Sequence, residues 1–351
     1  MMAVKVKIGD KLVGDGEPVF IVAEAGSNHN CKLEQAKQLI DVAASAGADA
    51  IKFQTFSADK IVAKTGPKAG YMKKVSKQES VYEIFKRIEL PREWHSKLVE
   101  YSRKKGLIFL SSPFDEEAVD LLDDLDVPAF KVASGELTNL LLIKYMARKG
   151  KPLIVSTGAA TMVEVGEAVS VIKKEGNKKI VLLHCVVNYP AAPEDANLLA
   201  MDALKKKFKL PVGYSDHTLG IAAPLAAVAL GAVMIEKHFT LSRKLPGPDH
   251  FYAVEPNELK MMVDGIRVVE KMRGASTKKP TKAEMEMRKL ARRSIFAKVD
   301  IPAGAVIKRE MLVVLRPAIG LEPKHLEGIV GMKTKVSIRR FESITFDKIQ
   351  R

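Results

Sequence analysis

Reactive and hydrogen-bonding residues in the first 250 positions of this chain stand at the ends of short apolar runs. There are eight such runs: VFIVAE, AIKFQ, LIFLSS, AFKVASGE, PLIVSTG, IVLLHC, PVGYSDH and VMIEKHF. The polar residues that they carry are Glu24, Lys52, Gln54, Ser111, Ser112, Lys131, Ser134, Glu136, Ser156, Thr157, His184, Ser215, His217, Glu236 and His238. If the runs converge in space, these cations, hydroxyls, carboxylates and imidazoles would line one active site.

The two lysines of this set, Lys52 and Lys131, favour a site for an anionic ligand. They stand among the hydroxyl groups of Ser112, Ser134, Ser156 and Ser215. Two cations and several short hydrogen-bond donors suit a ligand with several anionic oxygens, such as a carboxylate together with a phosphate. Two alternatives stay open: a lysine in an apolar strand could form a Schiff base, or it could pair structurally with a glutamate.

Two histidines, His217 and His238, end the last two runs. On adjacent strands they would bring two imidazoles within bridging distance of one divalent metal ion. Glu236 precedes His238 by two residues, so the two side chains would point to the same face of the strand. This pattern favours a metal site, although a histidine pair alone is a weak signal.

Two acidic residues are further candidates. Glu24 ends the first run and could act as an acid or base or stabilise positive charge. It could equally be the salt-bridge partner of Lys52. Asp249 lies in PGPDH, where the prolines and a glycine predict a rigid turn that suits recognition of substrate hydroxyls, or a purely structural loop.

Helical patterns separate the apolar runs. In residues 33–43 apolar side chains recur at the spacing of one helix face, and similar patterns occupy residues 115–124, 138–148, 161–174 and 220–230. A strand followed by a helix, repeated eight times, predicts an α/β fold, a (β/α)₈ TIM barrel, whose active site lies at the carboxyl ends of the strands. Residues 57–91 interrupt the rhythm after the second strand, and we expect this long insertion to act as a lid.

The chain divides into three parts by composition. Residues 1–273 are expected to form the barrel, with an amino-terminal β-hairpin in which apolar and polar residues alternate. The polar, Gly-, Pro- and Lys-containing stretch over 274–289 is typical of a linker. Residues 290–351 contain short β-rich runs and Pro/Gly turns, which predict a small α+β domain.

Composition excludes several classes of protein. The chain has 351 residues, 47% of them hydrophobic, and no apolar run near 18 residues, so we expect no membrane span. No secretory signal is evident, which favours a cytoplasmic protein. Its net charge of +15 comes without stacking platforms or a recognition helix, so nucleic acid is not an expected partner. Two cysteines give no disulfide framework, and Cys185 is expected to be a small buried filler.

Nine motifs, in this order, resemble the sialic acid synthase (N-acetylneuraminate synthase) family. They are VAEAGSNHN, IKFQTF, SSPFD, KVASGE, STG, LHCVVNYP, GYSDHT, IEKHFTL and GPDH. The blocks RRSIFA, PAG and LRP resemble the small antifreeze-like (SAF) domain that ends these enzymes. The resemblance covers almost the whole chain.

The resemblance implies a reaction. Family members condense phosphoenolpyruvate with an N-acylated amino sugar to give a nine-carbon sialic-type acid and phosphate. The acceptor would be N-acetylmannosamine or a close relative. Its 6-phosphate and a 2,4-diacetamido sugar stay open as alternatives.

The resemblance also implies roles for individual residues. Glu24 would be the catalytic carboxylate, and His217 and His238 would bind Mn²⁺, with Mg²⁺ or Co²⁺ as alternatives. Phosphoenolpyruvate would be held by Lys52, Ser112, Lys131, Ser134, Ser156 and Ser215. Residues near the sugar would be Gln54, Tyr189 and Asp249, and Glu236 is a further candidate for substrate binding.

Arg316, in the LRP block, matches an arginine that reaches the sugar's N-acyl group across a domain-swapped homodimer. Two departures from the family pattern concern the sugar site. Val187 stands where family members often carry asparagine, with Asn188 beside it, and Ala253 stands where serine is common.

Two other functions compete with this interpretation. A metal-dependent barrel aldolase would use pyruvate or a related 2-oxo acid instead of phosphoenolpyruvate. A non-catalytic protein that binds sugars or surfaces would use the basic carboxyl-terminal domain, but it would not need Glu24, His217 and His238.

Overall fold

The computed structural model describes residues 4–68, 70, 72 and 78–351. Two compact units make up the chain, residues 1–274 and residues 275–351. No helix in the described ranges is both long and apolar enough to cross a membrane.

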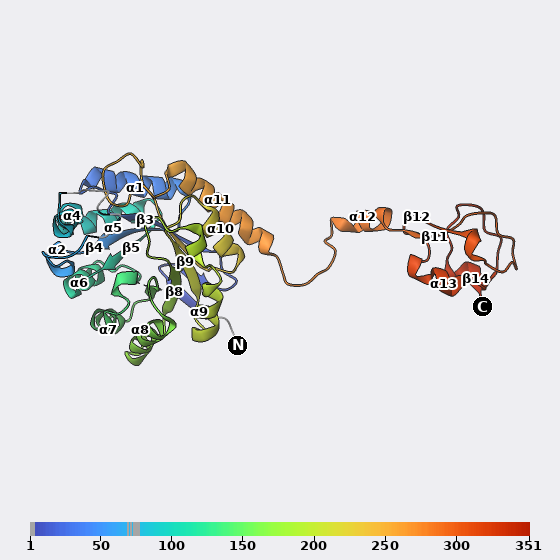
Figure 1. Ribbon diagram of the computed structural model, residues 1–351, viewed down its shortest axis with the longest axis horizontal. Coiled ribbons are helices and arrows are strands. Elements are labelled where there is room, and N and C mark those ends of the chain that lie inside the picture. The colour runs from blue at the N-terminus through green and yellow to red at the C-terminus, as the bar shows by residue number, and fades with distance from the viewer. Residues whose placement is uncertain (1–3, 69, 71, 73–77) are drawn as a thin grey trace. The chain divides into compact units, whose positions relative to one another are not determined.

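The first unit is a closed barrel of eight parallel strands, which confirms the predicted fold (Figure 1). Around the barrel each strand pairs with its neighbours in chain order, and β10 closes the ring by pairing with β3. The strands are β3 (Phe20–Gly26), β4 (Ala50–Thr55), β5 (Ile108–Pro113), β6 (Phe130–Val132), β7 (Leu153–Ser156), β8 (Ile180–Cys185), β9 (Val212–Asp216) and β10 (Met234–His238).

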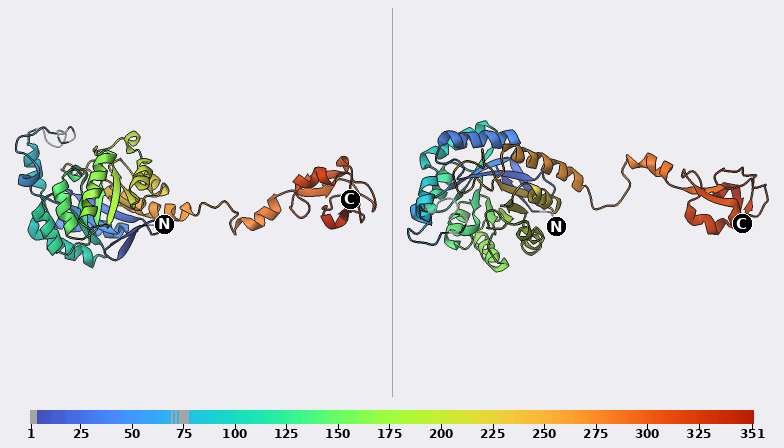
Figure 2. Two further views of the ribbon diagram at one scale, coloured as in Figure 1. Left: turned by 90° about the horizontal axis from the view of Figure 1, so that it is seen from below. Right: turned by 45° about the horizontal axis from the view of Figure 1, so that its top comes forward.

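Each strand is followed by a helix that packs on the outside of the barrel. The helices are α1 (Leu33–Ala46), α5 (His95–Lys104), α6 (Glu116–Asp124), α7 (Leu140–Arg148), α8 (Met162–Lys174), α9 (Ala200–Phe208), α10 (Ala222–Ala229) and α11 (Pro256–Arg273). In Figures 1 and 2, α1 (blue) and α11 (orange) run side by side, so the last helix completes the ring beside the first.

The sequence explains these elements locally. Every residue of β8 is buried, as expected for a parallel strand between a packed interior and a helix layer. Gly47 ends α1 in the left-handed conformation at φ 83°, which glycine adopts without strain, and its N–H bonds to the carbonyls of Ala43 and Ala44. The turn returns the chain directly into β4.

An amino-terminal hairpin, β1 (Lys5–Ile8) and β2 (Lys11–Gly14), packs at the amino ends of the barrel strands. Its side chains Val6, Ile8 and Val13 join a buried cluster with Phe20 and Met234, which begin β3 and β10. The hairpin thus packs at the end of the barrel opposite to the carboxyl ends of the strands.

Over its described residues, the insertion between β4 and α5 contains the short helices α2 (Ala58–Ile61) and α4 (Val81–Ile88) and the turn η1 (Arg92–Trp94). Ser80 and Glu83 form a capping box that begins α4. Residues 69, 71 and 73–77 of the predicted lid lie outside the described residues, so its movement stays a prediction.

The second unit begins at Ala275, within residues 274–289, which the sequence assigned to a linker. The helix α12 (Glu284–Ala291) starts in the same segment. The small core of this unit gathers apolar side chains of β11 (Ser294–Ala297), β12 (Leu312–Leu315), β14 (Ile349–Gln350) and α13 (Leu326–Ile329). The short strand β13 (Lys333–Thr334) pairs with β14.

Short 3₁₀ turns occur in both units. Those of the first unit include η2 (Ser134–Glu136) and η3 (Pro193–Ala196), and those of the second include η4 (Arg309–Met311), η5 (Pro323–His325) and η6 (Phe346–Lys348).

Candidate active site

A cavity of about 630 Å³ opens at the carboxyl ends of the barrel strands. It is lined by all the candidate site residues of the first unit: Glu24, Lys52, Gln54, Ser112, Lys131, Ser134, Ser156, Tyr189, Ser215, His217, Glu236, His238 and Asp249. The remaining candidate, Arg316, is an exposed residue of the second unit, at the end of β12.

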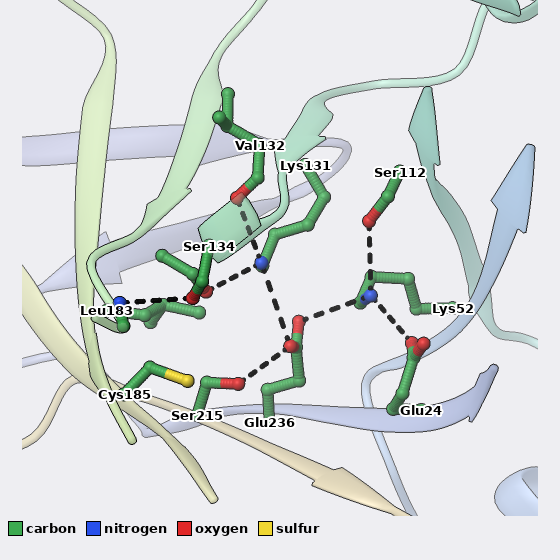
Figure 3. A network of polar contacts seen from close by, with 12 residues as sticks. Glu24, Lys52, Ser112, Lys131, Val132, Ser134, Leu183, Cys185, Ser215 and Glu236 are labelled. Carbon is green, nitrogen blue, oxygen red and sulfur yellow. Dashed lines mark hydrogen bonds and ion pairs between the residues drawn. The ribbon is translucent and has the colours of Figure 1, made fainter. Parts of the chain in front are cut away.

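Lys52, on β4, is the centre of one half of the polar network (Figure 3). Its Nζ lies 2.7 Å from Glu24 Oε2, on the neighbouring strand β3, and donates a hydrogen bond to Ser112 Oγ at 3.3 Å. Gln54 Nε2 donates to the other oxygen of Glu24 at 3.2 Å. The salt bridge between Lys52 and Glu24, one of the alternatives for Glu24, is therefore present.

Lys131, on β6, is the centre of the other half. Its Nζ donates hydrogen bonds to Ser156 Oγ at 2.6 Å and to the carbonyl of Val132 at 3.1 Å. Glu236 lies between the two halves, with its carboxylate oxygens 3.7 Å from Lys131 Nζ and 3.7 Å from Lys52 Nζ. Ser215 donates to the same carboxylate at 2.9 Å, and Figure 3 shows these groups pointing toward one another.

The two buried carboxyl groups of this network have opposite electrostatic environments. Burial raises the pKa of Glu24 to about 7; Lys52 opposes this shift and Glu236 adds to it. Burial also raises the pKa of Glu236, but the attraction of Lys131 and Lys52 outweighs it and holds that pKa at about 2. When Glu24 is protonated, one carboxylate faces two lysines, which leaves the cluster ready to accept an anion.

The lysines also differ. Burial lowers the pKa of Lys131, and its carboxylate partner Glu236 is 3.7 Å away. Burial acts in the same direction on Lys52, but Glu236 and Glu24 raise the pKa of Lys52 overall. Lys131 is therefore the amine whose positive charge depends more on the arrival of an anionic ligand.

The two histidines are adjacent, with ring centroids 5.3 Å apart. His217 Nδ1 lies 2.8 Å from the carbonyl of Val186, and His238 Nδ1 lies 3.5 Å from the hydroxyl of Tyr252. Burial, and then the charge of His217, lowers the pKa of His238 well below its usual value. The His238 ring is therefore neutral, which is the form of histidine that binds a metal ion.

The donors around these rings fit a divalent ion. A bond from Nδ1 to a backbone carbonyl orients a histidine so that Nε2 is available to a metal. The pKa of His217 is raised by Cys185 and Val186 against the effect of burial, and a neutral ring protonated on Nδ1 keeps the bond to Val186. Over the described part of the chain, no three His, Cys, Asp or Glu side chains form a metal-binding group. An ion here would complete its shell with water and substrate oxygens.

Comparison with known protein families decides the relationship. Residues 39–278 match the NeuB family and residues 292–350 match the SAF domain. The chain belongs to the NeuB family. The resemblance found in the motifs is therefore confirmed, together with the SAF domain at the carboxyl end.

Two similar relatives of this NeuB family chain are named as synthases of a sugar acid. It is 44% identical to the N,N'-diacetyllegionaminic acid synthase of Legionella pneumophila, over 97% of this chain and 98% of that protein. It is 45% identical to the N,N'-diacetyllegionaminic acid synthase of Campylobacter jejuni, over 89% of this chain and 94% of that protein. Among solved structures, the N-acetylneuraminic acid (sialic acid) synthetase of Leptospira borgpetersenii, in complex with citrate, is 36% identical with a TM-score of 0.74, over 81% of this chain and 95% of that chain.

Several polar residues of the apolar runs do not line the cavity. Ser111 bonds to Thr55 behind the strands, His184 bonds to the carbonyl of Ala196, and Thr157 bonds to the carbonyl of Leu183. Glu136 bonds to Asn139. Side chains alternate along a strand, so only every second residue can face the cavity.

Sequence analysis did not single out several residues that line the cavity, among them Cys185 and Tyr252. Cys185 is buried, as expected, but it is not merely a filler, because its Sγ lies 3.7 Å from His217 Nδ1 and lines the cavity. The alternation that turns His184 outward could have indicated this. Tyr252 donates to Asp249 at 3.0 Å and packs against the rings of His238 and Tyr189, and no pattern in the sequence distinguishes it.

Asp249 is held beside the histidines from two sides. Its carboxylate accepts hydrogen bonds from Ser27 Oγ and from Tyr252, both at 3.0 Å. The approach is close enough to require glycine at position 26, which has φ 50°, because a Cβ there would lie 2.9 Å from the Asp249 carboxylate and 3.3 Å from the His238 ring. Asp249 is therefore a fixed acceptor in the cavity.

Proposed function

We propose that this protein condenses phosphoenolpyruvate with the open-chain aldehyde of an N-acylated amino sugar, and that it releases phosphate and a nine-carbon sialic-type acid. The observation that carries the proposal is the convergence of Lys52 and Lys131, with three serine hydroxyls, in a cavity that also contains Glu24 and the histidine pair. Membership in a family with synthases of this kind supports it.

The donor would bind at the two lysines. Phosphoenolpyruvate carries a carboxylate and a phosphate, and the two buried amines with the hydroxyls of Ser112 and Ser156 offer charge-assisted hydrogen bonds to both groups. Ser134, whose Oγ already accepts from the N–H of Gly158, retains a hydroxyl proton to donate. With the anionic donor bound, both lysines act as positive charges and not as nucleophiles, so this reaction requires no Schiff base.

Bond formation would join C3 of phosphoenolpyruvate to the aldehyde carbon of the sugar. The electron pair of the enol double bond forms the new C–C bond, and the aldehyde oxygen takes a proton to become a hydroxyl. Positive charge develops at C2, where ionised Glu24 stabilises it electrostatically. Water adds at C2 and loses a proton, and the tetrahedral intermediate collapses with cleavage of the C–O bond to phosphate.

His217 and His238 would hold a divalent ion, Mn²⁺ first and Mg²⁺ or Co²⁺ as alternatives. When bound, the ion would supply Lewis acidity to the carbonyl oxygen of the aldehyde. Residues of the chain do the rest of the positioning: Asp249 offers a fixed carboxylate to a sugar hydroxyl, and the Tyr189 ring, 4.4 Å from the His217 ring, bounds the same space.

The two relatives named above support a choice among the candidate acceptors. Both named curated relatives are N,N'-diacetyllegionaminic acid synthases, which favours a 2,4-diacetamido sugar over N-acetylmannosamine and its 6-phosphate. Gln54, beside Glu24, would lie near this acceptor. We also propose that Arg316 contacts the N-acyl group from the partner chain of a domain-swapped homodimer. The cytoplasmic location expected from the sequence stays a prediction.

A donor and acceptor screen tests the proposal. The enzyme with Mn²⁺ is incubated with phosphoenolpyruvate or pyruvate and each of the three aldehydes, and inorganic phosphate and product mass are measured. One phosphate per nine-carbon acid, from phosphoenolpyruvate only, is the expected result. Turnover with pyruvate and no phosphate release would instead establish the aldolase, which the named synthase relatives do not favour.

A further inference from the structure

A buried ion pair lies on the outer side of β9 and β10, one residue before each of the two histidines. Lys237 Nζ donates hydrogen bonds to Asp216 Oδ2, at 2.5 Å, and to the carbonyl of Thr218. Both residues are 1% exposed, and neither lines the cavity. We call Asp216 and Lys237 the outer ion pair; no step of the proposed reaction uses it.

The outer ion pair is joined to the backbone on both sides of His217. Asp216 precedes His217 and accepts hydrogen bonds from the backbone N–H of Thr218, at 2.9 Å, and from its hydroxyl, at 3.1 Å. Lys237, which precedes His238, bonds to the carbonyl of the same Thr218. Asp216 and Lys237 are also direct partners in the register of β9 and β10.

Stability alone does not account for this pair. Removing two charges from water costs more than their attraction usually returns, and apolar residues of similar volume often serve a fold equally well. What a charged pair adds is a fixed distance and direction between the groups that it joins. Here those groups are the peptides next to His217 and His238.

We infer that Asp216 and Lys237 are positioning residues that set the separation and tilt of the His217 and His238 rings. This inference rests on the proposed function, because the distance between the rings matters only if both bind one ion. Residues that orient metal-binding histidines from outside the ligand set typically change metal affinity 10- to 100-fold when replaced.

Three variants test the inference: Asp216→Asn, Lys237→Met and the double variant. Each single variant leaves a buried group without its partner, so both thermal stability and Mn²⁺ affinity should fall. The double variant removes both charges and should regain most of the lost melting temperature. Its Mn²⁺ affinity, measured from the electron paramagnetic resonance signal of free Mn²⁺, should stay at least tenfold below that of the wild type. Wild-type affinity in the double variant would overturn the inference.

An ion pair at the other end of the barrel serves as a control that separates positioning from general loosening of the barrel. Arg267 Nη2 pairs with Asp49 Oδ2 at 3.0 Å, at the opposite end of the strands. Arg267→Met should lower the melting temperature and leave Mn²⁺ affinity unchanged. If this control weakens Mn²⁺ binding as much as the double variant does, the outer ion pair has no specific role.

Ring geometry gives a readout that does not depend on the metal. The His217 and His238 rings lie 5.3 Å apart at an interplanar angle of 47°, and a crystal structure of the double variant should show a changed separation or tilt. If wild-type protein binds no Mn²⁺, the metal part of the proposed function fails. The crystal structure then decides the inference alone, and an unchanged separation and tilt of the two rings would refute it.

If the double variant does not fold, Thr218→Val replaces it, because this change removes one hydrogen bond to Asp216. Its Mn²⁺ affinity and its ring geometry are measured as before, and the inference is refuted if both are unchanged.

Discussion

Replacing Glu24 by glutamine should make this protein more stable at neutral pH and far less active. Glutamine has the shape of the protonated carboxyl group and cannot ionise, so the variant is held in the neutral state. In the wild type, burial raises the pKa of Glu24 to about 7, against the attraction of Lys52, so ionising this group in the folded protein has a free-energy cost.

The sign and size of the stability effect follow from this pKa. The ordinary value is 4.5, so the neutral carboxyl favours the folded state fully below pH 4.5, and this contribution is lost as the pH rises toward about 7. A gap of roughly 2.5 pH units corresponds to about 3 kcal/mol. Glu24→Gln should therefore exceed the wild type in free energy of unfolding by up to about 3 kcal/mol at pH 8, and the two should converge below pH 4.5.

The catalytic effect has the opposite sign. A carboxylate about 4 Å from a developing unit charge, at an effective dielectric constant of about 20, contributes about 4 kcal/mol. Loss of this electrostatic interaction should lower kcat by about 10³-fold. Because the interaction acts only in the transition state, KM for both substrates should change little.

The assay compares the two proteins by thermal or urea unfolding at pH 5 and pH 8, and by steady-state kinetics. Glu34→Gln, which removes a 78% exposed carboxylate that pairs with Lys37, is the control for the loss of one charge. A Glu24→Gln variant less stable than the wild type at pH 8 would mean that the ion pair with Lys52 outweighs burial. Unchanged kcat would leave Glu24 as a structural partner of Lys52 only.

Three further predictions concern the rest of the site. Lys131→Met should raise KM for phosphoenolpyruvate by about 10²-fold, because a charge-assisted contact to an anion is worth about 1.5–3 kcal/mol; an unchanged KM would place the donor elsewhere. Excess chelator should abolish turnover and Mn²⁺ should restore it, whereas His217→Ala and His238→Ala should stay inactive with Mn²⁺; full activity in chelator would refute the metal site. Arg316→Ala should raise KM for the amino sugar alone. Exchange of Arg316→Ala subunits with Glu24→Gln subunits should restore part of the activity, because in a domain-swapped dimer both changes fall in one site and the other site is intact. Subunit exchange without recovery of activity would refute the domain-swapped dimer.

The sequence predicted the barrel because its signal is repeated. Eight continuous apolar runs alternating with helical patterns permit few other folds, and all eight runs became strands of one closed sheet. The hairpin at the amino end was equally visible, because its apolar and polar residues alternate.

The inner and outer faces of the strands were harder to assign. Ser111 and Ser112, or His184 and Cys185, are adjacent in sequence, yet one member of each pair lines the cavity and the other bonds behind it. Continuous burial on both faces hides the alternation that would distinguish them. Contacts such as that between Tyr252 and Asp249 depend on how a loop folds back over the barrel, which no spacing rule contains.

Glu236 also has a consequence for which anions this protein can distinguish. Its carboxylate sits 3.7 Å from both lysine amines, so the cavity already contains one negative charge of its own. A chloride or acetate ion meets two cations whose charge Glu236 partly neutralises. A ligand with two separated anionic groups can contact both amines at once and gain from each. We expect the site to favour a ligand with two anionic groups over small monovalent anions without any steric gate, because the carboxylate that weakens the attraction for a single charge is part of the barrel itself.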